Sequence, residues 1–215
     1  MPMTNLLSLT ARRRAIAARA ACAALAATFA SAIVVTPVQV QAQAGKIAIT
    51  IETSLGTIEA VVDSAKAPVS ATNFLKYVDQ HAYDGGRFHR SVRMDNQAAN
   101  AVKIEVIQGG RAQGIPGFPP VPLERTNVTG LHHLDGTLSM ARGGPDTATS
   151  DFFICIGPQP ELDFAGKRNA DGQGFAAFGQ VTKGMDIVRR IQSQPANAQA
   201  LTPPIAIVRI TRVAR

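Results

Sequence analysis

The sequence predicts a mainly β protein, a closed antiparallel β-barrel whose open ends are covered by two α-helices. Short apolar runs rich in β-branched residues recur along most of the chain, separated by turn pairs such as Gly85-Gly86 and Gly109-Gly110. Only two stretches carry apolar residues at helical spacing. Many short strands with few helices are typical of a sheet that closes on itself.

Residues 1–44 have the composition of a secretory signal peptide. Arginines 12–14 and Arg19 precede an uncharged, alanine-rich run over residues 20–35, and Ala42-Gln43-Ala44 offers small residues for cleavage. The apolar run is shorter than the ~20 residues of a membrane span. We expect cleavage after Ala44, a periplasmic product and no stable membrane insertion afterwards. The alternative is a retained anchor helix.

The basic charge of the chain lies largely in that segment. The whole chain has 22 basic and 15 acidic residues, a formal charge of +7, but residues 45–215 keep only 18 of the basic ones. The remaining excess of about +3 points to no charged partner. No nucleic-acid partner is expected.

The mature chain is predicted to begin with a hairpin and a helix. Residues 46–52 alternate, Ser54-Leu55-Gly56 forms a turn, and residues 57–63 continue as a second strand. A helix is predicted over residues 68–80, because Ala71, Phe74, Leu75 and Val78 recur at the spacing of one helical face.

Strands dominate the rest. We predict them at residues 87–90, 104–108, 137–141, 152–156 and 175–181. A second helix is expected over 184–192, a loop rich in Pro, Ala and Asn over 194–204, and a last strand over 205–213.

Cysteine and histidine usage predicts neither a disulfide nor a metal site. Cys22 lies in the predicted signal peptide, which leaves Cys155 alone within an apolar run, where a buried core residue is expected. His132-His133 has no further ligands at metal spacing and is interpreted as loop.

Six segments in order resemble the cyclophilin family of peptidyl-prolyl cis–trans isomerases, over essentially the whole mature chain. They are Pro68-Val-Ser-Ala-Thr-Asn-Phe74, Tyr83-Asp-Gly-Gly-Arg-Phe-His-Arg90, Gln108-Gly109-Gly110, Gly136-Thr-Leu-Ser-Met-Ala141, Ser150-Asp-Phe-Phe-Ile154 and Phe178-Gly-Gln-Val-Thr-Lys-Gly-Met-Asp186. The resemblance implies an eight-stranded barrel capped by two helices, with a proline-binding groove on its outer face.

The resemblance also implies the site residues. Arg90 and Gln108 would be catalytic. The substrate would contact Val106, Ala141, Arg142, Phe153, Leu162 and Phe175. Phe152 and Phe153 are neighbours, so strand alternation sends one to the core and the other to the groove without saying which.

The chemistry of prolyl isomerisation suits these residue types. The barrier to rotation is about 18–20 kcal/mol, and no bond has to break. A charged donor aimed at the prolyl nitrogen binds it more strongly as the lone pair localises in the twisted state. Arg90 is the expected donor. Gln108 would hold a substrate carbonyl and steady Arg90, and the backbone of Ala141-Arg142 would pair with the substrate like an added strand.

The chain departs from the family pattern at three places. Residues 91–103 look inserted, and we expect a polar surface loop that forms one wall of the groove. Glu105 and Glu161 stand where the family has aromatic residues, which suggests a hypothesis that they select basic residues beside the proline.

The leading interpretation is a monomeric isomerase that acts on proline-containing exported polypeptides without a cofactor or metal. The rival is a binding module of the same fold, a chaperone or scaffold with little catalysis. Convergence of Arg90 and Gln108 despite the longer loop would favour the enzyme. A secreted hydrolase has no support, because no nucleophile–base pair is recognisable.

Overall fold

The computed structural model describes residues 45–214. The predicted signal peptide, residues 1–44, lies outside the described residues. Among those described, no helix has the length and apolar character needed to cross a membrane.

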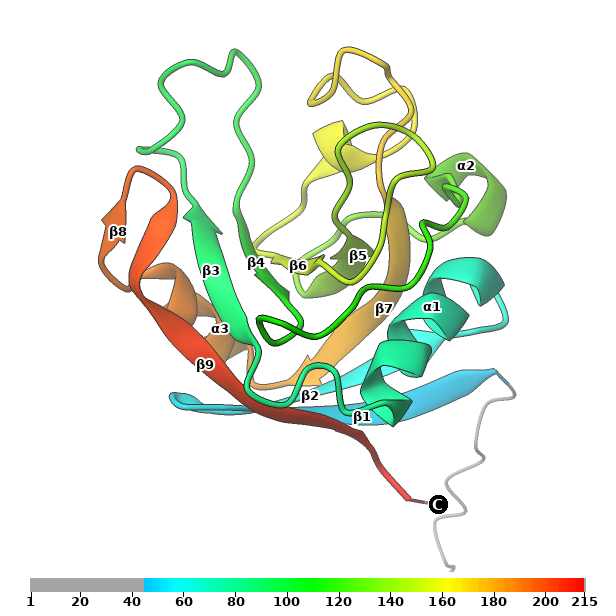
Figure 1. Ribbon diagram of the computed structural model, residues 1–215. Coiled ribbons are helices and arrows are strands. Elements are labelled where there is room, and N and C mark those ends of the chain that lie inside the picture. The colour runs from blue at the N-terminus through cyan, green and yellow to red at the C-terminus, as the bar shows by residue number, and fades with distance from the viewer. Residues whose placement is uncertain (1–44, 215) are drawn as a thin grey trace, which may run out of the picture. The chain divides into compact units, whose positions relative to one another are not determined.

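Nine strands form one antiparallel sheet that closes into a barrel (Figure 1). The strands are β1 Lys46–Thr53, β2 Gly56–Asp63, β3 Arg87–Val92, β4 Val106–Gly110, β5 Thr137–Met140, β6 Phe152–Cys155, β7 Ala176–Lys183, β8 Ala196–Asn197 and β9 Ala200–Arg212. Their order is β1-β2-β7-β5-β6-β4-β3-β9, and β9 pairs back with β1 to close an eight-stranded ring. The two-residue β8 only adds a short hairpin to β9. The predicted fold class is therefore confirmed.

Strand alternation fills the barrel with apolar side chains. Ile49 and Ile51 of β1 and Ile58 of β2 are fully buried. Their strand neighbours Thr50 and Thr57, which point to the other face, are not. Phe74, Phe88, Phe152 and Phe178 lie in the same core cluster. The aromatic rings of this cluster pack edge-on or tilted, as Phe74 does against Phe152 at 5.3 Å between ring centroids.

Two helices of eight or more residues pack against this barrel. Helix α1, Pro68–Asp79, contacts β2, β7 and β9, and helix α3, Met185–Gln192, contacts β2, β3 and β4. Proline in the first turn of α1 suits a helix start, because its missing N–H has no partner to lose there. A four-residue helix, α2 Thr126–Thr129, and a 3₁₀ turn at Pro160–Leu162 are additional to the prediction.

One predicted element is partly wrong. The expected loop over residues 194–204 contains β8 and the first five residues of β9. Proline at 203 and 204 obscured the strand, since proline cannot donate to a sheet, yet edge segments tolerate it. This hairpin places Ala200 opposite Arg90 of β3.

Candidate active site

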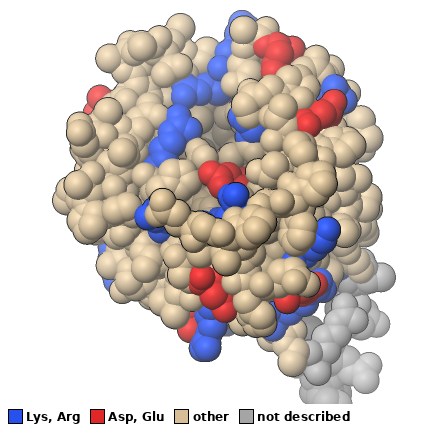
Figure 2. Space-filling model, in the orientation of Figure 1, with Lys and Arg blue, Asp and Glu red and all other residues tan. Residues whose placement is uncertain are grey.

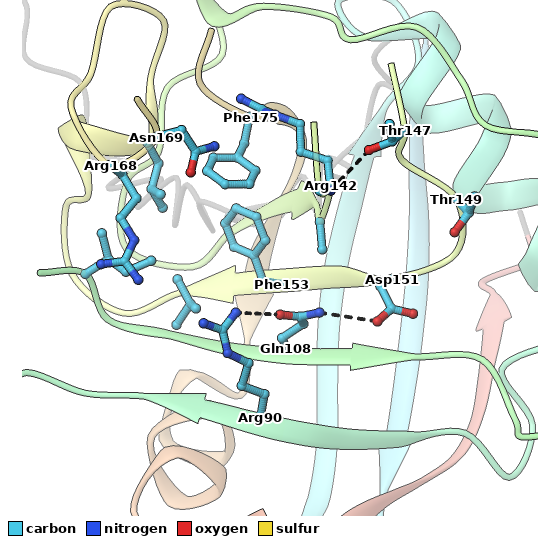
Figure 3. A pocket seen from close by; sticks show the side chains of 15 residues that line it. Arg90, Gln108, Arg142, Thr147, Thr149, Asp151, Phe153, Arg168, Asn169 and Phe175 are labelled. Carbon is cyan, nitrogen blue, oxygen red and sulfur yellow. Dashed lines mark hydrogen bonds between the residues drawn. The ribbon is translucent and has the colours of Figure 1, made fainter. Parts of the chain in front are cut away.

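All eight predicted site residues line one cavity of about 430 Å³ on the barrel (Figure 3). Arg90 comes from β3, Val106 and Gln108 from β4, and Phe153 from β6. Ala141 and Arg142 follow β5, Leu162 ends the 3₁₀ turn, and Phe175 precedes β7. Thus six segments spread over 86 positions of sequence converge on one hollow.

Sheet register aligns the centre of the site. Arg90 lies opposite Gln108 across β3 and β4, and Gln108 lies opposite Phe153 across β4 and β6. Directly paired residues on antiparallel strands share a face and lie within side-chain reach. The register therefore puts a cation, an amide and an aromatic ring in one row across three strands.

A bulge in β3 turns Arg90 outward. Phe88 pairs with Gly109 and Arg90 with Gln108, so His89 is an extra residue with no partner of its own on β4. Phe88 and Arg90 are two positions apart and would share a face on a regular strand. The bulge separates them: Phe88 is fully buried in the core, and Arg90 points into the cavity.

The Arg90 guanidinium is held by two glutamines. Its Nη1 donates to Oε1 of Gln108 at 3.0 Å, and its Nε and Nη2 both donate to Oε1 of Gln199 at 2.9 and 2.6 Å. Burial lowers the pKa of Arg90 from its usual value, yet an arginine stays protonated at neutral pH. The cation is thus directed by neutral groups that leave its charge uncompensated.

Gln108 connects Arg90 to a carboxylate. Its Nε2 donates to Oδ2 of Asp151 at 3.2 Å, which fixes the amide so that its oxygen faces Arg90 (Figure 3). Asp151 also lies 3.7 Å from Nε2 of His89. Gln108 thus steadies Arg90, as the sequence predicts.

An apolar cluster forms the floor beside Arg90. Ile104, Val106, Phe153 and Leu162 are buried together, with Ala141 and Phe175 packed against them. The rings of Phe153 and Phe175 meet edge to face, with 5.3 Å between centroids and 90° between planes. These side chains offer an uncharged socket of the kind that a proline ring fills.

The structure resolves which phenylalanine faces the groove. Phe152 packs in the barrel core against Phe74, Tyr83 and Phe88. Phe153 belongs to the groove cluster.

The ring of His133 packs against the ring of Phe153. Its ring stacks on Phe153 at 5.9 Å and 16°, Nδ1 lies 2.6 Å from Oδ1 of Asp163, and Nε2 lies 2.9 Å from Oγ of Ser139. In the tautomer that carries its proton on Nδ1, the ring donates to the Asp163 carboxylate, and Nε2 accepts from the Ser139 hydroxyl. His133 is therefore a buried structural residue in a loop, consistent with its interpretation from sequence.

The expectations for the two glutamates are wrong. Neither side chain lines the cavity. Glu105 alternates away from Val106 and accepts a hydrogen bond from Nε2 of Gln192 in α3 at 3.1 Å, while Glu161 turns back on its own loop and accepts from the backbone N–H of Lys167. Ile104 takes a place in the socket instead. The hypothesis that these carboxylates select basic residues loses its basis.

The segment 91–103 supports the cavity without supplying its wall directly. Gln97 is 2 % exposed, and its Nε2 donates to the carbonyl oxygens of Arg93 and Ile104 at 2.7 Å. Its Oε1 accepts from Nη1 of Arg168, which lines the cavity. Asn96 accepts at its carbonyl from Gln199, the partner of Arg90. The segment therefore does not form the expected wall of the groove. It holds Arg168 directly and holds Arg90 through Gln199.

Several cavity residues escaped sequence reasoning. They are Ile104, Gly143, Thr147, Thr149, Asp151, Arg168 and Asn169. Asp151 lies within one segment that carried the resemblance, and Thr149 directly precedes that segment, so their place just before β6 could have indicated them. Gln199 and Arg168 lie in loops, where no periodicity assigns a direction to a side chain.

Arg142 lines the cavity and forms an ion pair with Asp171. Its side chain is 1 % exposed, and Nη1 and Nη2 each donate to a different oxygen of Asp171 at 2.8 and 2.9 Å. Its Nε donates to the carbonyl of Gly174, and its guanidinium lies 4.9 Å from the centre of the Phe175 ring. Arg142 therefore fixes the loop that carries Phe175.

The structure also bears on the predictions for Cys155 and for metal binding. Cys155 is fully buried, as predicted, and burial, with the charges of Asp163 and Asp135 adding, raises the pKa of its thiol. Within residues 45–214, no group of three or more His, Cys, Asp and Glu side chains is arranged to hold a metal ion. The chemistry available at the cavity is that of directed hydrogen-bond donors beside an apolar socket.

The chain matches the family model described as cyclophilin type peptidyl-prolyl cis-trans isomerase/CLD over residues 48–214. A peptidyl-prolyl cis-trans isomerase of Acinetobacter baylyi is 35 % identical over 159 residues, which cover 70 % of this chain and 74 % of that one. Peptidyl-prolyl cis-trans isomerase A of Dickeya dadantii is 41 % identical over 150 residues, covering 65 % and 67 %.

Solved structures agree on the fold. The crystal structure of a cyclophilin type isomerase from Cryptosporidium parvum covers 79 % of this chain and 99 % of its own, with a TM-score of 0.64 and 22 % identity. The same protein crystallised in the presence of the dipeptide Ala-Pro matches with a TM-score of 0.63 and 21 % identity. At these identities the likeness concerns the fold.

Proposed function

Because this chain belongs to the family of cyclophilin-type peptidyl-prolyl cis–trans isomerases, we propose that it isomerises X–Pro bonds of exported polypeptides, using Arg90 as the donor to the prolyl nitrogen. The observation that carries the proposal is the placement of the Arg90 guanidinium beside the socket of Val106, Phe153 and Leu162. A proline ring in that socket would bring its nitrogen toward the cation.

The geometry supports differential binding of the twisted amide. In the planar ground state the nitrogen lone pair is delocalised and accepts hydrogen bonds poorly. In the twisted state it localises, so a donor already held in place by Gln108 and Gln199 binds it more strongly without reorganising. The socket holds one side of the rotating bond while the other side turns.

The rival function, a proline-binding module with little catalysis, is less well supported. Its basis in the sequence is Glu105, Glu161 and the longer loop. Both carboxylates lie outside the cavity, and Arg90 and Gln108 converge at 3.0 Å in spite of the loop. Proline-containing polypeptides are the partners proposed under either function, and the Ala-Pro dipeptide present with the Cryptosporidium parvum protein supports this choice.

The first test is prolyl isomerisation of a short peptide by residues 45–215, compared with the Arg90→Ala variant. Loss of one preorganised donor is expected to lower kcat/KM about a hundredfold or more. Circular dichroism checks that the variant keeps its fold. Binding of proline peptides by the unmodified protein without catalysis would favour the rival function.

Export is tested separately. Residues 1–44 are proposed to act as a cleaved signal peptide that delivers the enzyme to the periplasm as a monomer. After expression of the full chain in a Gram-negative host, the periplasmic fraction should contain a protein that begins at Gly45 and sediments as a monomer. Recovery of uncleaved chain in the membrane fraction would support an anchor instead.

A further inference from the structure

A second arginine borders the proline socket. Arg168 lies in the loop between the 3₁₀ turn and β7, and it lines the same cavity as Arg90. Figure 3 shows both guanidinium groups on the same side of Phe153, with Arg168 reaching in from the loop and Arg90 from β3. Thr147, Thr149 and Asp151 lie on the other side of that ring.

Arg168 is held in place by neutral groups only. Its Nη1 donates to Oε1 of Gln97 at 2.9 Å and to the carbonyl oxygen of Val102 at 2.6 Å, and its backbone N–H donates to the carbonyl of Glu161. Nε and Nη2 have no hydrogen-bond partner within residues 45–214. The side chain is thus oriented, while part of its donor fork remains available to a ligand.

Arg168 and Arg90 together make one end of the cavity positively charged. Neither forms an ion pair with any carboxylate of the described chain, whereas the third arginine of the cavity, Arg142, is neutralised by Asp171. Burial first, and then the charge of Arg90, lowers the pKa of Arg168. Two uncompensated cations at one end of a half-buried hollow favour an anion there. In the surface view, basic side chains border a central hollow, and an acidic group lies at its lower edge (Figure 2).

We propose that Arg168 forms an anion-recognising subsite beside the proline socket, which makes the enzyme prefer polypeptides with an acidic side chain next to the proline. A carboxylate there accepts from Nε and Nη2 of Arg168 and offsets the repulsion between the two guanidinium groups. This rests on the proposed function. It reverses the preference for basic residues that Glu105 and Glu161 suggested from sequence.

The test uses the purified chain and peptides with acetylated and amidated ends, so that one side chain carries the only variable charge. Glu, Gln and Lys are placed in turn immediately before and immediately after the proline. At low salt we expect kcat/KM for Glu to exceed that for Lys about fivefold at one of the two positions. High salt should reduce the ratio, because screening weakens a partly exposed pair.

Three variants locate the effect. Arg168→Gln should bring the Glu-to-Lys ratio close to one, while Arg168→Lys, which keeps a cation, should retain most of it. Lys167→Gln is the matched control, because it removes the same charge from the neighbouring residue, whose exposed side chain lines a different hollow. A ratio near one in the unmodified protein, or a ratio that survives Arg168→Gln, would overturn the proposal.

The same peptides separate this proposal from the proposed function. If the neutral Gln peptide is not isomerised, the proposed catalysis fails. The ratio of dissociation constants for the Glu and Lys peptides, measured by isothermal titration calorimetry, still decides the subsite. Equal affinities would then count against Arg168 even if both peptides bind.

Discussion

Arg90 and Gln199 are 109 positions apart in the chain, yet two nitrogens of the guanidinium donate to a single oxygen of the amide, Nε at 2.9 Å and Nη2 at 2.6 Å. The amide is itself held, because Nε2 of Gln199 donates to the carbonyl oxygen of Asn96 at 3.2 Å. Asn96 in turn donates to the carbonyls of Ser91 and Ala198. The β8–β9 turn and the loop after β3 therefore fix the direction of the proposed donor together.

This relationship predicts that Gln199 is a positioning residue. Gln199→Leu removes the acceptor and lets the guanidinium swing, so kcat should fall about tenfold to a hundredfold. KM should stay within about twofold, since the apolar socket is unchanged. Gln199→Glu keeps an acceptor oxygen but loses the donor to Asn96 and pairs the charge of Arg90, so it should recover only part of the lost activity. A merely structural role would make both variants lose stability with no such split.

The two neighbouring phenylalanines should respond in opposite ways. Phe152→Leu alters the barrel core and should lower the free energy of unfolding by about 1–2 kcal/mol, with near-normal turnover by the folded protein. Phe153→Leu reshapes the socket and should lower kcat/KM about tenfold, mainly through KM. Thermal unfolding and peptide isomerisation distinguish the two. Equal kinetic losses would contradict the assignment of faces.

Asp163 should make stability depend on pH in the acid range. Burial alone would raise its pKa, but hydrogen bonds from His133 and His132 outweigh this and hold the pKa below its usual value of 3.8. A lowered pKa in the folded state means that the ionised carboxylate stabilises the fold above the unfolded-state pKa. That contribution is lost as the pH falls through the folded-state value.

The corresponding experiment compares Tm for the unmodified protein and Asp163→Asn between about pH 7 and pH 3. The gap in Tm should be widest near neutrality and narrow toward the acid end. Asp186→Asn, at an exposed site on α3, is the control and should show little gap at any pH. A difference in Tm that does not change with pH would mean that Asp163 stabilises the fold through packing and not through its charge.

Gln97 should carry much of the stability of the loop after β3. Gln97→Ala leaves the buried carbonyl of Ile104 without its donor and removes one of the two donors to the carbonyl of Arg93, at a cost of about 1–3 kcal/mol in the free energy of unfolding. Asn100→Ala, at an exposed position of the same loop, should change stability by less than about 0.5 kcal/mol. Chemical denaturation measures both. Equal effects would show that Gln97 is not the anchor of the loop.

Local patterns in the sequence predicted the barrel and its two main helices, and the family resemblance implied the eight residues expected at the site. Apolar alternation and turn pairs are local signals, and six segments in order tie Arg90 and Gln108 to one family. These local signals sufficed for the strands and helices because each element is specified mainly by the residues within it.

The directions of several side chains become clear only in the folded chain. The bulge after Phe88 turns Arg90 outward, alternation from Ile104 turns Glu105 toward α3, and Gln199 and Arg168 reach the cavity from loops. Period-two alternation assigns a face only once register and bulges are known. A loop side chain takes its direction from contacts with distant segments, as Arg168 does from Gln97, and those contacts exist only in the closed barrel.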